Sequence, residues 1–85
     1  MIKRLFTVFD SKSEVYMPPF TYRTKGEAIR AFTDSVNDSG SQMNKYPADF
    51  TLFDIGSFDD VTCKFDVQSP ESIGNAIEFV VKDGD

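Results

Sequence analysis

The sequence predicts an α+β fold, in which a mostly antiparallel sheet of three or four strands carries one main helix on one face and a short C-terminal helix. Three observations predict it. The 85 residues fit a single domain, residues 24–37 place apolar side chains at helical spacing, and residues 50–67 have the pattern of a β-hairpin. Because so short a chain buries only roughly 60 to 65% of its unfolded surface, its core must be small and aromatic. We expect this core to contain Phe6, Val8, Ile29, Phe32, Leu52, Ile55, Phe65 and Val67.

Residues 1–23 predict strands. Residues 2–9 are β-branched and aromatic and end at a polar turn cluster, residues 10–13, which predicts a central strand. Two short segments, 15–17 and 20–22, flank Pro18 and Pro19, which remove two backbone donors from any ladder. They therefore predict an edge strand or an extended arm.

Residues 24–37 predict the main helix. Thr24 and Glu27 match a capping box, in which the hydroxyl accepts a backbone N–H and the carboxylate reaches back to another. Gly40 lies just beyond the end, where a left-handed cap or loop is common. The apolar stripe of this helix consists of Ala28, Ile29, Phe32 and Val36.

Residues 50–67 predict the hairpin. Gly56 interrupts the first strand and predicts a bulge or a close backbone approach. In the second strand Val61, Cys63, Phe65 and Val67 alternate with polar residues, which predicts one buried and one solvated face. Cys63 is therefore expected in the core, with a reactive or cross-linking thiol as the alternative.

Residues 69–81 predict the C-terminal helix, with Ser69 as its N-cap and Pro70 at its first position. Ile73, Ile77 and Val80 fall on one stripe, which we expect to dock against the sheet or against another copy of the chain. Residues 82–85 are expected to fray.

The composition argues against an enzyme. The chain has no His, which removes the commonest general base, the commonest metal ligand and every Ser-His or Cys-His nucleophile. Asp54, Asp59, Asp60 and Asp66 could be read as hard-cation ligands, but their spacing matches no calcium loop. No glycine-rich phosphate loop is present. We therefore predict no catalytic residue, no metal and no cofactor.

The single Cys cannot form a disulfide within the chain, and small secreted domains usually have several disulfides. The longest apolar runs are far shorter than the roughly 20 residues that span a bilayer. These observations favour a soluble protein in a reducing compartment.

Charge is unevenly distributed along the chain. Residues 1–30 hold six basic and three acidic residues, whereas residues 31–85 hold three basic and eleven acidic residues. The net charge of −5 makes the whole chain a poor generic binder of nucleic acid. Only the N-terminal third has the composition for phosphate contacts.

Basic and aromatic residues are interleaved in this third. Such side chains on a sheet can stack bases while they follow phosphates, as in single-strand binders. The alternative is that the rings belong to the core, which a chain of this size needs. The candidate nucleic-acid contacts are Lys3, Arg4, Arg23, Lys25, Tyr16 and Tyr22.

Five short runs carry a family resemblance. They are residues 6–10, 19–20, 28–32, 47–52 and 55–59, reading FTVFD, PF, AIRAF, PADFTL and IGSFD. In this order and spacing they resemble the small non-structural protein of gokushovirus-type microviruses, the Microviridae with single-stranded DNA. The sequence departs from that pattern at Met17-Pro18 and in the acidic stretch after residue 60.

The resemblance implies a phage protein that acts in the cytoplasm of a bacterial host and assists single-stranded DNA synthesis or DNA packaging, without catalytic residues. We carry two functions forward: an accessory with weak DNA binding, and a module that binds a phage capsid, replication or host protein through an edge strand or the C-terminal helix. A homodimer or larger homo-oligomer is expected. The alternative is a monomer whose edge strand is kept from pairing by its prolines. The candidate partner contacts are Pro18, Pro19, Phe20, Ile73, Ile77 and Val80.

Overall fold

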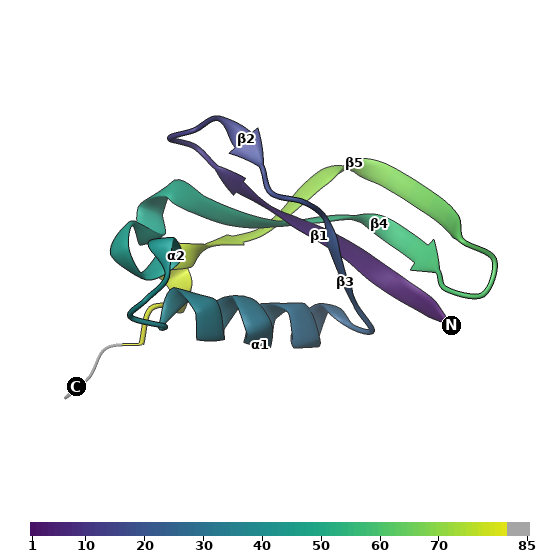
Figure 1. Ribbon diagram of the computed structural model, residues 1–85, viewed down its shortest axis with the longest axis horizontal. Coiled ribbons are helices and arrows are strands. Elements are labelled where there is room, and N and C mark those ends of the chain that lie inside the picture. The colour runs from purple at the N-terminus through teal and green to yellow at the C-terminus, as the bar shows by residue number, and fades with distance from the viewer. Residues whose placement is uncertain (82–85) are drawn as a thin grey trace.

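The computed structural model describes residues 1–81 and has the α+β architecture that the sequence predicts (Figure 1). Its strands are β1 (Ile2–Asp10), β2 (Val15–Tyr16), β3 (Phe20–Tyr22), β4 (Phe50–Asp59) and β5 (Lys64–Asn75). Its helices are α1 (Lys25–Val36), the short α2 (Gln42–Lys45) and two 3₁₀ turns, η1 (Pro47–Asp49) and η2 (Ala76–Phe79). The expectation that residues 82–85 fray lies outside the described residues.

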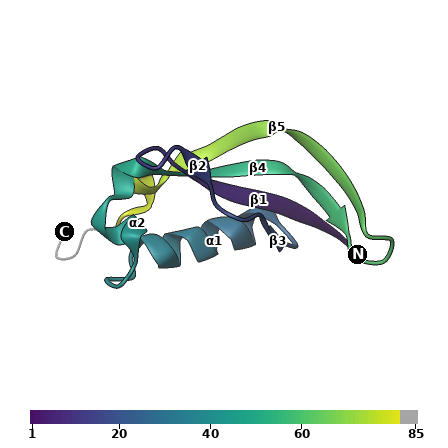
Figure 2. The same cartoon turned by 45° about the horizontal axis from the view of Figure 1, so that its top comes forward.

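The sheet is antiparallel, with the order β2-β1-β4-β5 and with β3 also paired to β1. β1 is therefore central, as predicted, and Pro18 and Pro19 interrupt the edge between β2 and β3. β5 forms the other edge. Figure 2 shows α1 along one face of this sheet, while the opposite face has no helix on it.

The α1 helix begins as its sequence predicts. The Thr24 Oγ1 accepts a hydrogen bond from the backbone N–H of Glu27 (3.1 Å), and the Glu27 carboxylate accepts one from the backbone N–H of Arg23. The first bond satisfies an orphan donor of the helix and confirms Thr24 as the N-cap. The second goes to the residue before the N-cap, so the reciprocal bond of a capping box is not formed with Thr24 itself. The core between α1 and the sheet is formed by Phe6, Val8, Ala28, Phe32, Val36, Phe50, Leu52 and Ala76.

The predicted core is confirmed near α1 and wrong at the far end of the hairpin. Phe6, Val8, Phe32 and Leu52 are buried, and Ile29 and Ile55 are half-buried. Phe65 and Val67 are instead 56% and 68% exposed, and Cys63 is exposed in the turn between β4 and β5. The reason is that the strand register places both side chains on the face of the sheet opposite α1, which no helix of the described chain covers (Figure 2).

The predicted helix over residues 69–81 is also wrong in its range. β5 continues through Ser69 and Pro70 to Asn75, and only the 3₁₀ turn Ala76–Phe79 follows. Its true N-cap is Asn75, whose side chain accepts from Ile77 N–H while Glu78 accepts from Asn75 N–H. Pairing with β4 outweighs the local Ser-Pro start signal, because Gly74 and Asn75 are weak helix formers.

Candidate binding face of the sheet

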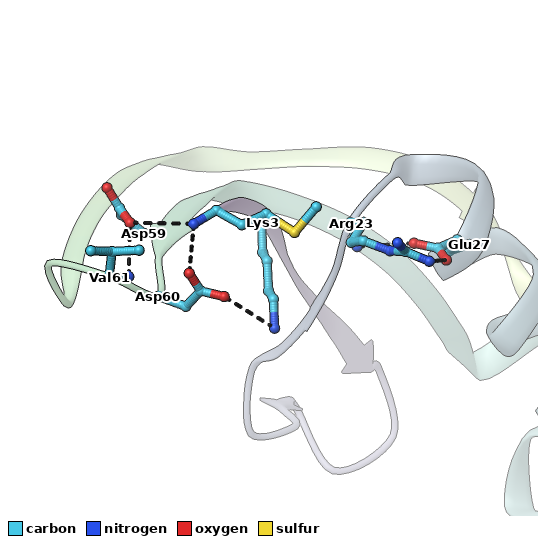
Figure 3. A network of polar contacts seen from close by, with 7 residues as sticks. Lys3, Arg23, Glu27, Asp59, Asp60 and Val61 are labelled. Carbon is cyan, nitrogen blue, oxygen red and sulfur yellow. Dashed lines mark hydrogen bonds and ion pairs between the residues drawn. The ribbon is translucent and has the colours of Figure 1, made fainter.

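Three of the four predicted basic contacts are engaged in ion pairs, and Figure 3 shows those of Lys3 and Arg23. The Lys3 Nζ lies 3.6 Å from an Asp60 oxygen. The Arg4 guanidinium donates to both oxygens of Asp54 at 2.7 and 3.0 Å. The Arg23 guanidinium lies 3.4 Å from Glu27. Lys25 is exposed in the first turn of α1.

Carboxylates therefore offset most of the charge at this end of the molecule. The N-terminal ammonium donates to Asp60 at 2.7 Å, and this hydrogen bond together with Lys3 holds the pKa of Asp60 below its ordinary 3.8. The backbone N–H of Val61 lowers the pKa of Asp59 in the same way. Both acids stay ionised at neutral pH, so they compete with phosphate for the cations beside them.

The two predicted tyrosines lie on opposite faces of the sheet. Tyr22 is half-buried beside the α1 core, where it meets the ring of Phe20 edge-on at 5.9 Å. Tyr16 is 50% exposed on the other face. The six predicted nucleic-acid contacts therefore do not form one surface.

The predicted partner contacts are similarly divided. Pro18 and Pro19 are exposed, whereas Phe20 stacks on buried Phe6 at 6.1 Å and packs against the core. Ile73 packs against the core as well, but from β5. Ile77 is 57% exposed and Val80 is 39% exposed, so the predicted stripe does not dock as a unit.

The face of the sheet opposite α1, here called the outer face, carries an apolar groove that the sequence does not reveal. Thr7 and Ile55 lie between two walls, and the Thr7 hydroxyl donates to the Met17 carbonyl at 2.7 Å. The groove has a volume of about 290 Å³. Its walls are Tyr16, Met17 and Pro19 on one side and Val67, Gln68 and Pro70 on the other.

An aromatic cluster lies at one end of this groove. Cross-strand pairing places Phe9 opposite Tyr16 and Thr7 opposite Phe53, and directly opposed residues share a face. The Tyr16 ring lies 4.7 Å from Phe9 and 5.8 Å from Phe53. These three rings form one continuous surface with the groove. The groove lining contains no charged side chain.

Gly56 determines the shape of the groove. It has a φ of +134°, and β4 there holds one residue more than β1, since Leu5 pairs with Gly56 and Phe6 with Asp54. This is the bulge that the sequence predicts. On the other side, Ile55 lies opposite the three residues between Val67 and Glu71. These extra residues of β5 form the groove wall that contains Pro70.

A metal-binding cluster is not found in the described part of the chain. Residues 1–81 contain no group of three His, Cys, Asp or Glu side chains that could hold a metal ion. No helix among these residues is long and apolar enough to cross a membrane. The outer face therefore provides a groove and apolar surface area.

The chain matches a known family of proteins. The family model described as Phage ORF5 protein matches residues 3–79, which include all of the described strands and helices except Ile2 at the start of β1. Neither the comparison with curated proteins nor the comparison with solved structures found a match.

Proposed function

The chain belongs to the Phage ORF5 protein family, and from this premise we propose that it is a non-enzymatic accessory protein that binds a phage or host protein through its outer face. The chain is a phage protein. The resemblance to the small non-structural proteins of gokushovirus-type microviruses supports a narrower assignment within that description. On this proposal it acts in the cytoplasm of a bacterial host, during DNA synthesis or packaging.

The uncovered apolar groove carries this proposal. Small soluble domains bury apolar side chains where they can, and a rimmed apolar surface on an otherwise charged molecule is typical of a binding site. Here Tyr16 and Val67 remain 50% and 68% exposed on opposite walls of one groove. Groove walls that carry proline and aromatic side chains suit an extended segment of a partner protein.

Phage yield from a complementation system tests the proposal. A phage that lacks this gene is supplied with the wild-type protein, with Val67→Lys or with Val61→Lys. Both valines are exposed, at 68% and 80%, but only Val67 lines the groove. We expect Val67→Lys to lower progeny per cell at least tenfold, because it places an ammonium group in an apolar contact surface.

Val61→Lys is the matched control and is expected to support wild-type yield. Thermal melts establish that both variants fold. Equal yields from two folded variants would refute the proposed use of this face.

The aromatic cluster supports a second candidate, weak contact with single-stranded DNA. Exposed rings on an open sheet face can stack bases, and Tyr16, Phe9 and Phe53 are contiguous. The ion-paired cations leave few free phosphate contacts, so binding should be weak and should fall steeply with salt. A titration with a labelled oligonucleotide at two salt concentrations measures this. Tight binding that ignores salt would contradict the electrostatic reasoning.

A further inference from the structure

β5 presents a long unpaired edge. It is the terminal strand of the sheet (Figures 1 and 2). Residues 64–72 are all exposed, on both of its faces. Among them Phe65 is 56% and Val67 is 68% exposed. An edge of this kind is a ready template for pairing with another strand.

The protective features of this edge lie beyond Val67. Pro70 lacks an N–H, and the register with β4 is irregular between Val67 and Glu71 and again between Ser72 and Gly74. Residues 64–67, in contrast, pair regularly with β4 residues 56–59. The regular part of the edge is therefore the stretch that begins at Lys64, and a partner strand has to fit that stretch.

The charges on this stretch are complementary to those of a second copy. In an antiparallel pair of two identical strands with the twofold axis at Phe65, Lys64 of each copy lies opposite Asp66 of the other. The same symmetry places the two Phe65 rings opposite one another. A shift of the axis to Asp66 would instead oppose two carboxylates, so the charges select one register.

We propose that the chain forms a homodimer in which the β5 edges of two copies pair antiparallel about a twofold axis at Phe65. Two identical patches related in this way make an isologous interface that closes on itself. Since Phe65 and Val67 alternate with Lys64 and Asp66, pairing places the apolar and charged side chains on opposite faces of the joined sheet. Val67 belongs both to this edge and to the outer-face groove, but Lys64 and Asp66 do not line the groove, so substitutions at these two positions test the pairing separately.

Charge reversal tests the register. Lys64→Glu places two acidic pairs across the axis, and Asp66→Lys places two basic pairs there. Each variant alone should dimerise at least tenfold more weakly than the wild type, because like charges directly opposed are destabilising. An equimolar mixture of the two variants should recover association, since every opposed pair is then acid to base. Sedimentation equilibrium of the full chain near 0.15 M salt, where long-range repulsion is screened, measures all three.

Glu71→Lys is the matched control, because it changes the charge of β5 as Asp66→Lys does but lies beyond the irregular segment. It should dimerise like the wild type. Circular dichroism melts are recorded at a concentration at which every variant is monomeric. They distinguish a variant that pairs weakly from one that has lost its fold. A wild-type chain that is monomeric at about 100 µM, or folded variants whose mixture associates no better than either alone, would overturn the proposal.

Discussion

Replacing Gly56 by Ala tests how the bulge holds β5 in place. Gly56 adopts φ +134°, a backbone conformation that residues with a Cβ rarely take. A Cβ built there would lie 2.1 Å from the backbone oxygen of Asp66 and 2.9 Å from the Val67 Cα. Both are atoms of the β5 backbone, which cannot move without breaking its pairing with β4.

The cost follows from these two effects. A strained backbone conformation costs roughly 1–3 kcal/mol, and displacing β5 adds lost backbone hydrogen bonds at about 1 kcal/mol each. We therefore expect Gly56→Ala to lower the free energy of unfolding by about 2–4 kcal/mol. A small domain has about 5–15 kcal/mol in total, and each kcal/mol shifts the melting temperature by roughly 4–8 °C.

Urea unfolding and thermal melts measure the effect, with Gly26→Ala as the control. Gly26 lies in the first turn of α1, where an added Cβ would meet only the Thr24 Oγ1 at 3.8 Å. That substitution should be neutral or stabilising by up to about 1 kcal/mol. If Gly56→Ala melts like Gly26→Ala, the account of the bulge is wrong.

Three further substitutions, one of them combined with a change of pH, test other parts of the structure. Phe79→Ala should destabilise the domain by about 2–4 kcal/mol in urea unfolding, since its half-buried ring packs against the core, while the exposed Ile77→Ala should stay within about 0.5 kcal/mol. The pKa values of Asp10, Asp59 and Asp60 are lowered, so these groups should stabilise the fold fully at neutral pH and lose that contribution as the pH falls through their folded pKa values below 3.8. Urea unfolding at pH 6 and pH 3 should show this loss, and Asp60→Asn should make it smaller. Equal pH dependence in Asp60→Asn and the wild type would count against the Asp60 pairing.

The parts of the fold that local sequence determines could be predicted. The N-cap at Thr24, the stripe of α1 and the bulge at Gly56 each depend on residues close in sequence or on one backbone requirement. The interrupted edge at Pro18 and Pro19 is equally local, because proline cannot donate to a ladder.

The C-terminal third could not be predicted correctly, because its structure depends on distant partners. Ser69-Pro70 has the residues of a helix start, but β4 supplies a strand partner as far as Asn75. The alternation from Val61 to Val67 predicts which side chains share a face. It cannot show which face of the sheet α1 covers, and α1 lies on the opposite face (Figure 2).

The candidate site was missed for a similar reason. Its two groove walls come from residues 16–19 and 67–70, which only the sheet topology brings together across β1 and β4. The pairing of Arg4 with Asp54 joins residues fifty positions apart, so a count of basic residues overestimates the free positive charge. The alternation of residues 61–67 indicated an apolar face on β5, but it did not indicate that this face is left uncovered.

Photo-crosslinking in infected cells tests the central claim, that the outer face binds a protein partner. Benzoylphenylalanine replaces Tyr16 on the groove wall or, as the control, Tyr46, which is equally exposed at 48% against 50% but lies outside the groove. The account predicts a discrete, protease-sensitive adduct with another protein at position 16 and none at position 46. An adduct that only nuclease removes would favour the DNA candidate. No adduct at position 16, or the same adducts at both positions, would contradict the claim.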